Sequence, residues 1–195
     1  MNFVRNIFAL IGVLVFLAIA AASPFFLQVK DRLAQFDEQA LATYAEMAQK
    51  ILDTGNAADA TVWKVKVNEG LTADDVDQTI KLVANEHNIK NVGELPLYQQ
   101  VAAMTGKPYR FVKIYMFCNA LTAAKMLDYS DAYGAYLPCR LSLIEDKQGA
   151  LWIYTLNMDP MIYGGLPLPA DLKQEAIKVK DIMLDVLKRG STGDF

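Results

Sequence analysis

The stretch Phe111–Met161 limits what this chain can fold into more than any other part of the sequence. Phe111–Cys118 is apolar on both faces and rich in β-branched and aromatic residues, which is typical of a central strand. Two further strand-like runs, Arg140–Ile144 and Leu151–Leu156, flank the turn at Asp146–Gly149, whose glycine can adopt the positive φ of a hairpin turn. We therefore expect a small antiparallel or mixed sheet.

The region before this stretch predicts one more strand and a helix. Thr61–Val67 alternates between apolar residues and lysines, as a half-exposed strand does. Thr72 is followed by acidic residues and an apolar stripe, which indicates that it is the N-cap of a helix. Gly93–Pro96 is expected to break the chain, and Leu97–Met104 to form a short helix.

Two more helices are predicted around the sheet. Asn119 is a candidate N-cap for Ala120–Leu127, and an amphipathic helix is expected from Ala170 to Gly190. Pro138 cannot donate a ladder hydrogen bond, so the following strand should begin after it. The fold class is α+β, with helices packed on the sheet.

The N-terminus carries a long apolar segment with two interpretations. Ile7–Ala22 is unbroken, and Phe25–Leu27 extends it to about the 20 residues that span a bilayer. Ala20–Ala22 before Ser23 resembles the cleavage site of a signal peptide. The length of the segment favours an uncleaved anchor, and both interpretations export the rest of the chain. Arg5 favours a cytoplasmic N-terminus.

Residues Lys30–Leu52 are predicted to form one amphipathic helix after the anchor. Its apolar stripe includes Phe36 and Tyr44. The stripe either packs on the chain's own domain, as a stalk, or docks onto a membrane partner, and in the second case Phe36 and Tyr44 are interface residues. We expect a transmembrane segment over residues 1–27, the stalk over 28–56 and the exported α+β domain over 57–195.

Charge and cysteine content exclude several classes of function. With 19 basic and 22 acidic residues, the chain lacks the positive charge that nucleic-acid binding requires. Two cysteines and one histidine are too few for a four-ligand structural zinc site. The sequence contains neither Cys-x-x-Cys nor a c-type haem attachment motif. We therefore expect no bound metal and no resident cofactor.

The chain from about Thr61 to Met161 resembles the domain of unknown function 302 family. The resemblance rests on the alternating first strand, the Thr72-Ala73-Asp74-Asp75 helix start and two junctions, Tyr115-Met116-Phe117-Cys118-Asn119 and Leu137-Pro138-Cys139-Arg140. It implies the fold, a tendency to form homodimers, and occurrence both as a free domain and behind an export signal. It implies no catalytic residues. The C-terminal helix is expected to lie outside this core.

The two cysteines have three interpretations. Exported proteins are exposed to oxidising conditions, so Cys118 and Cys139 are candidates for a disulfide, provided that their Cα atoms lie within about 7 Å. Both can instead be inert buried thiols. The third interpretation is a reactive or metal-binding thiol.

His87 and Arg140 are candidate ligand-binding residues. His87 lies near the predicted C-terminus of its helix, where a capping role is expected. The alternative is haem ligation opposite one of the methionines Met104, Met116, Met158 and Met161. Arg140 can form a salt bridge or bind an anion.

The remaining candidates are residues of the segment 158–163 and the carboxylate of Glu145. Met158, Met161 and Tyr163 are either core residues or an apolar contact surface. The carboxylates Glu145 and Asp159 have no spacing that would make them an acid–base pair, and we expect both in turns.

The sequence thus predicts a non-catalytic subunit, anchored in the inner membrane by a single pass, with its domain in the periplasm. It would be an accessory or assembly subunit of a larger membrane complex, of respiratory or photosynthetic type. The alternative is a periplasmic protein that binds a small ligand or haem in sulfur or redox metabolism. An enzyme that uses Cys118 or Cys139 is a third hypothesis.

Overall fold

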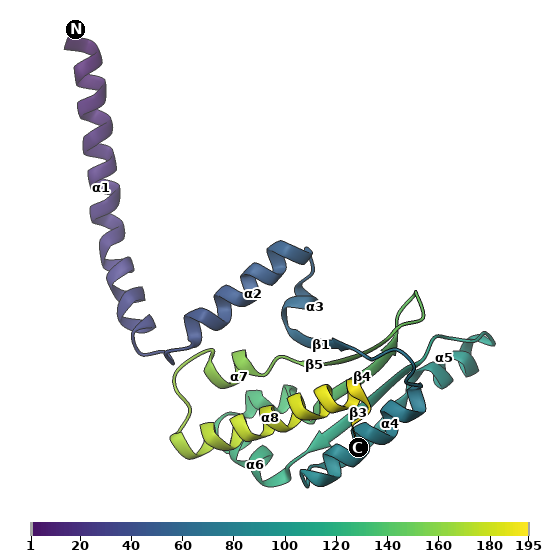
Figure 1. Cartoon of the computed structure of the whole chain (residues 1–195). Helices are drawn as coiled ribbons and strands as arrows, with labels where there is room; N and C mark the ends of the chain where they lie inside the picture. Colours follow the sequence, from purple (N-terminus) through teal and green to yellow (C-terminus); the bar gives the residue numbers. More distant parts are fainter. Residues whose placement is uncertain (1, 195) are drawn as a thin grey trace.

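The structure, a computed structural model, describes residues 2–194, and its centre is a 5-stranded sheet of order β1-β5-β4-β3-β2 (Figure 1). All neighbouring strands pair antiparallel. The predicted α+β fold with an antiparallel sheet is confirmed. The strands are β1 (Val62–Lys66), β2 (Lys90–Pro96), β3 (Val112–Cys118), β4 (Cys139–Glu145) and β5 (Leu151–Leu156).

The sheet differs from expectation at β2, which lies where we predicted only a break. Gly93 and Pro96 weaken a strand signal because glycine packs poorly and proline lacks a donor. Both residues are tolerated here because β2 is an edge strand, paired on one side only with β3. A β-bulge between Asn91 and Gly93 interrupts the register further.

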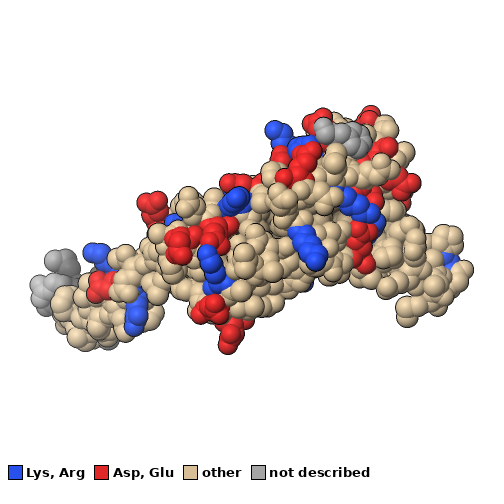
Figure 2. Space-filling model, turned by 90° about the horizontal axis from the view of Figure 1, so that it is seen from below, with Lys and Arg blue, Asp and Glu red and all other residues tan. Residues whose placement is uncertain are grey.

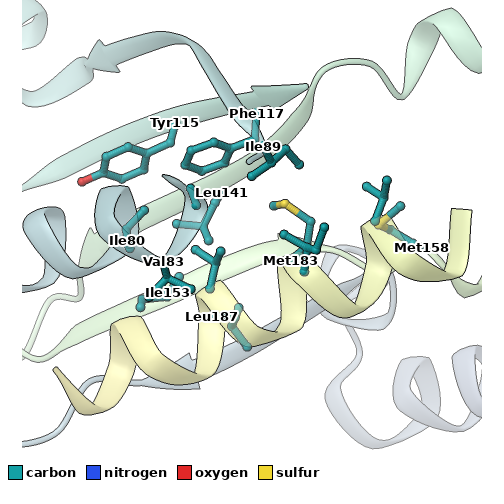
Figure 3. Close-up of a cluster of buried hydrophobic side chains, with 14 of the residues drawn as sticks. Ile80, Val83, Ile89, Tyr115, Phe117, Leu141, Ile153, Met158, Met183 and Leu187 are labelled. Carbon is teal, nitrogen blue, oxygen red and sulfur yellow. The ribbon is translucent and has the colours of Figure 1, made fainter. Parts of the chain in front are cut away.

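The helices that form the core lie on one face of the sheet (Figure 1). They are α4 (Ala73–Glu86), α6 (Ala120–Tyr129) and α8 (Ala170–Thr192). Figure 3 shows Tyr115, Phe117 and Leu141 of the sheet facing Ile80 and Val83 of α4 and Met183 and Leu187 of α8. The remaining helices are α3 (Ala57–Ala60), α5 (Leu97–Thr105), the 3-10 helix η1 (Asp131–Ala135) and α7 (Asp159–Tyr163).

Local signals in the sequence correctly placed several element ends. Thr72 caps α4 in a capping box with Asp75, whose carboxylate accepts from the Thr72 backbone N–H at 2.8 Å. The Asn119 side chain accepts from Thr122 N and begins α6. The turn between β4 and β5 has Gly149 at φ 84°. Helix α8 continues past the predicted end at Gly190, to Thr192.

The prediction of one helix over Lys30–Leu52 is wrong. Helix α1 (Asn2–Leu33) ends within that range, a turn follows, and α2 (Ala40–Thr54) begins anew. The break occurs at Asp37, which is only 5% exposed. Its backbone N–H donates to Gly165 O at 2.8 Å, and its carboxylate pairs with Lys173 of α8. This polar clamp to the body competes with helix continuation, which hydrophobic periodicity alone does not reveal.

Helix α1 extends away from the body, and α2 lies on the same side of the body as α1 (Figure 1). Every described side chain of α1 is exposed, and α1 is long and apolar enough to cross a membrane. At 1.5 Å per residue, Ile7–Leu27 spans about 31 Å, close to the hydrocarbon thickness of a bilayer. The anchor and signal-peptide hypotheses both predict such a helix.

Candidate functional site

A small cavity at one end of the sheet is lined by both cysteine residues. Cys118 is the last residue of β3, Cys139 is the first of β4, and these two strands are paired neighbours. Helices α6, α7 and α8 close the cavity from the helix-bearing side. Its lining comprises Phe117, Cys118, Asn119, Thr122, Ala123, Met126, Tyr133, Tyr136, Leu137, Cys139, Met158, Met161, Ala176 and Val179.

The ladder register places the two cysteines close to each other. Phe117 lies directly opposite Cys139, so Cys118 is one residue further along β3. Opposite Cα atoms are about 5 Å apart and one residue adds about 3.4 Å along the strand, which gives a Cα separation of about 6 Å. The Cα separation meets the distance criterion for a disulfide, but successive residues of a strand point to opposite faces, so the register directs the Cys118 and Cys139 side chains to different faces of the sheet. Both thiols are free in the structure, which gives the predicted bridge no support.

The surroundings of Cys139 suppress its nucleophilicity. Burial, together with the neighbouring Cys118, raises the pKa of the Cys139 thiol to about 11. Since the thiolate is the nucleophile, this thiol is almost fully protonated at neutral pH. Catalytic cysteines show the opposite shift, so this geometry does not favour covalent catalysis at Cys139.

The cavity holds about 40 Å³, little more than the volume of one water molecule in the liquid. Cofactor pockets are typically about 300–1,000 Å³, so haem would not fit without a large opening of the fold. An open groove of about 390 Å³ adjoins it, and the two share Tyr133, Tyr136 and Met161. These residues therefore stand between the solvent and the cysteines.

Sequence reasoning missed the contributions of Met126, Tyr133 and Tyr136 to this site. The spacing of Met126, Tyr129, Tyr133 and Tyr136, in steps of three and four residues, was the available signal. The ring of Tyr133 lies 6.1 Å from that of Tyr129 and 6.4 Å from that of Tyr136. The three rings therefore form one wall of the groove.

His87 lies apart from this cavity and is the C-cap of α4, as the capping interpretation predicted. Its Nε2 is 2.7 Å from Asp185 Oδ2 of α8. Asp185 is six residues beyond the cavity-lining Val179, about 9 Å along the helix. The ring nitrogen that a haem iron would need is therefore already engaged by a carboxylate.

The other polar candidates are Arg140, which forms no ion pair with the described residues, and Asp159 and Glu145, which have structural partners. Arg140 is exposed, and within residues 2–194 no carboxylate lies within ion-pair distance of it. Asp159 pairs with Lys180 at 2.6 Å, and Glu145 accepts a hydrogen bond from Phe111 N at 3.0 Å. Asp159 and Glu145 thus have separate partners and do not face one another.

The predicted interface residues divide into core and surface. Met158 and Tyr163 are buried, so they are core residues and not a surface contact. Met161 is half-buried at the mouth of the cavity. Phe36 is half-buried in the turn after α1, and Tyr44 is exposed on α2, where its hydroxyl donates to Gly164 O at 2.6 Å.

A second polar cluster, which we did not predict, lies where α4 meets β2 and β3. Asp77 accepts from Lys81 at 2.7 Å, from Lys113 at 2.6 Å and from the Tyr115 hydroxyl at 2.5 Å. Lys113 also pairs with Glu94 at 2.7 Å. Burial alone would raise the pKa of Asp77, but these hydrogen bonds outweigh it and lower the pKa. Lys113 within an apolar strand was the sequence signal.

The surface charge in Figure 2 is mixed: acidic and basic side chains are interspersed, with uncharged areas between them. A phosphate-binding face would need a contiguous basic patch. The face seen in this view does not carry one.

Fold and cavity together describe a small antiparallel α+β domain with a cysteine-containing cavity, preceded by an apolar helix. The family described as "Domain of unknown function DUF302" matches residues 63–190, and the chain belongs to this family. The match confirms the resemblance and corrects its extent, because α8 is part of the family domain and not an extension of it.

Comparison with solved structures supports the same fold. The chain is similar to a protein described as "Crystal structure of uncharacterized conserved protein DUF302 from Bacillus stearothermophilus", with 16% identity and a TM-score of 0.54. The similarity covers 66% of this chain and 97% of that one. At this identity it shows the fold alone. No curated protein matches the chain.

Proposed function

We propose that this protein is a non-catalytic subunit anchored by α1 in the inner membrane, with its body in the periplasm. There it would act as an accessory or assembly subunit of a larger membrane complex, of respiratory or photosynthetic type. The observation that carries this proposal is an unpartnered apolar stripe on α2, immediately after a helix that can cross the membrane.

The stripe lies on the side of α2 that faces away from the body. Ala40 and Thr43 are buried, which places their side of the helix against the body. The opposite side carries large apolar residues in solvent, with Leu41 63% and Leu52 80% exposed. Tyr44 and Ile51 are partly exposed as well, but they lie on the side of Ala40, where the Tyr44 hydroxyl donates to Gly164 O of the body, so they do not belong to this stripe. Such a surface on an element next to a membrane is typical of a contact with another apolar surface.

The connection between α1 and α2 supports a fixed position for this stripe. Asp37 is clamped to Gly165 and to Lys173, so the turn that joins the two helices is held to the body. With α1 in the bilayer, the stripe would lie close to the membrane surface on the side where other membrane proteins are met. The high pKa of Cys139 favours a non-catalytic role.

Purification from native membranes in mild detergent tests this proposal. We expect the wild-type chain to migrate with other membrane proteins, and a Leu41→Gln/Leu52→Gln variant to migrate without them at unchanged thermal stability. Gln49→Ala, a substitution at an exposed polar position of α2, is the matched control and should retain the wild-type behaviour. Migration of the wild type only as a monomer or as a homodimer would contradict the proposal.

A second candidate function is favoured by the cysteine cavity: a periplasmic domain that binds a small ligand in sulfur or redox metabolism. The groove shared by Tyr133, Tyr136 and Met161 gives such a ligand a route from solvent. A visible absorption spectrum of the purified protein tests the haem version, which a colourless protein would rule out.

A further inference from the structure

The sheet carries its core helices on one face only. In Figure 1, α4, α6 and α8 lie below the sheet, whereas α1 and α2 rise above it. Successive residues of a strand point to opposite faces. Accordingly, Tyr115 and Leu143 point to the helices and are buried, whereas Ile114 and Ile144 point the other way and are only half-buried. We call this second side of the sheet the open face.

The charged residues at the strand positions of the open face are all basic. The register places four of them there, namely Lys64, Lys66, Lys90 and Arg140, and no Asp or Glu occupies a strand position on this side. Lys64 pairs with Asp59 of α3 at 2.8 Å. The other three are exposed, and residues 2–194 place no carboxylate within ion-pair distance of them. The chain as a whole has a net charge of −3, so the open face differs in sign from the rest of the molecule.

Two aromatic residues lie among these cations. Trp152 is opposite Lys66 and Tyr154 is opposite Lys64 in the ladder between β1 and β5, and both rings are half-buried. Asp146, in the adjoining turn, accepts from Trp152 Nε1 at 2.9 Å and from two backbone N–H groups, so its carboxylate is engaged within its own hairpin. Trp and Tyr beside Lys and Arg are typical of protein surfaces at the headgroup level of a membrane.

This composition discriminates between the partners that could cover the open face. A second copy, packed face to face, would bring cations against cations, and like charges across an interface are unfavourable. An anionic lipid surface supplies the opposite charge, and it attracts basic residues that lie within a Debye length of it.

Helix α1 brings the open face to the level of the headgroups. The apolar segment ends at Leu27 and α1 ends at Leu33, so the body begins about 9 Å beyond the hydrocarbon. The headgroup layer is itself about 5–7 Å thick. The clamp of Asp37 to Gly165 and Lys173 keeps the body next to the end of α1. Because α1 leaves the body on the side of the open face, this face is turned to the leaflet (Figure 1).

We propose that the open face docks onto the anionic headgroups of the leaflet that α1 enters. Lys66, Lys90 and Arg140 pair with lipid phosphates, and Trp152 and Tyr154 lie at the headgroup level. The body is then held flat on the bilayer, with α4, α6 and α8 turned to the periplasm. This inference rests on the membrane anchor of the proposed function and adds the lipid class that the body binds.

The fluorescence of Trp152 in the full chain, reconstituted in vesicles, tests the docking. A Trp63→Phe background leaves Trp152 as the reporter, since Trp63 packs on the core side. The vesicles contain phosphatidylcholine alone or with the anionic lipid phosphatidylglycerol, and a phosphatidylcholine brominated near the headgroup is the quencher. We expect strong quenching only in the anionic vesicles. It should decline when ionic strength rises from about 0.1 M to about 1 M, because the Debye length falls from about 10 to about 3 Å.

Substitutions in the same background separate the basic residues of the open face from charge in general. Lys66→Gln/Arg140→Gln should lower the ratio of docked to undocked body about 25-fold, since each basic residue near an anionic surface contributes about fivefold. Lys178→Gln/Lys188→Gln, at exposed lysines of α8 on the opposite side, removes the same charge and should leave the quenching unchanged.

Flotation with the vesicles reports the anchor separately from the docking. A chain that does not float would contradict both the anchor and the docking. A chain that floats while Trp152 is quenched equally weakly in both kinds of vesicle would overturn the docking alone. Protection of Trp152 from aqueous acrylamide without quenching by the lipid would show that a protein covers the open face, and would also overturn the proposal.

Discussion

Asp77→Ala removes the centre of the polar cluster between α4, β2 and β3. The carboxylate accepts three hydrogen bonds, from Lys81, Lys113 and Tyr115. Without this carboxylate, Lys113 still forms an ion pair with Glu94 at 2.7 Å, and Lys81 forms one with Glu94 at 3.3 Å. Tyr115 is fully buried, and its hydroxyl loses its hydrogen bond to the Asp77 carboxylate. The substitution therefore leaves one buried group unpaired and two lysines with half of their counter-charge.

The expected loss of unfolding free energy is about 3 kcal/mol. A buried hydroxyl without a partner costs about 1–3 kcal/mol. Breaking a fully buried ion pair costs about 3–5 kcal/mol, but this pair is partly exposed and Glu94 still pairs with both lysines, so the ion-pair part is about 1 kcal/mol. Alanine is a better helix former than aspartate, so helix propensity does not contribute to the loss. At about 2–4 °C per kcal/mol for a domain of this size, the melting temperature should fall by about 6–12 °C.

Thermal unfolding of the full chain in detergent, followed by circular dichroism, measures this loss. Asp74→Asn is the matched control, because Asp74 is an exposed carboxylate on the same helix without an ion pair, and it should change stability by less than about 0.5 kcal/mol. Tyr115→Phe, which leaves both lysines paired with Asp77, should cost only about 0.5–1.5 kcal/mol. If Asp77→Ala costs no more than Asp74→Asn, the cluster does not stabilise the fold and the reasoning fails.

The same structure gives three further expectations. The pKa of Asp77 is lowered in the fold, so its contribution is fully present above the unfolded pKa of about 3.9 and is lost as pH falls through the folded value. The stability gap between wild type and Asp77→Ala should therefore be constant from about pH 5 to 8 and shrink below about pH 4 in urea titrations, whereas a gap constant down to pH 2 would show that the charge of Asp77 contributes nothing. Gly190→Val should cost about 1–3 kcal/mol, because a Cβ at Gly190 would lie 3.0 Å from Ile80 Cγ1 and 3.1 Å from Ile153 Cδ1, and unchanged chemical denaturation would show that this contact relaxes freely. Asp37→Ala should speed amide hydrogen exchange in the turn between α1 and α2 and leave the exchange of β3 and β4 unchanged; exchange in the turn as slow as in wild type would mean that the Lys173 contact does not hold it.

The parts of the fold that sequence predicted well are those determined by local chemistry. Thr72 and Asn119 were recognised as caps because their side chains satisfy backbone N–H groups within three residues. The strand at Phe111–Cys118 was found because an interior strand is apolar on both faces. The apolar N-terminal helix followed from its length alone.

The parts that were missed depend on contacts between distant residues. Strand β2 owes its existence to pairing with β3, which offsets the weak strand preference of Gly93 and Pro96. The break at Asp37 depends on Lys173, which lies 136 residues away in the sequence. Within the candidate site, the two cysteines were recognised individually, but Met126, Tyr133 and Tyr136 join them only because α6 and η1 cover that end of the sheet.

The proposed function requires that α1 remains part of the mature protein and holds the body at the membrane. The most direct test is the intact mass of the chain recovered from the membrane fraction of native cells. We expect a mass that includes residues 1–22 and recovery with the membranes after a salt wash. A chain that begins at Ser23 and is recovered in the soluble periplasmic fraction would contradict it.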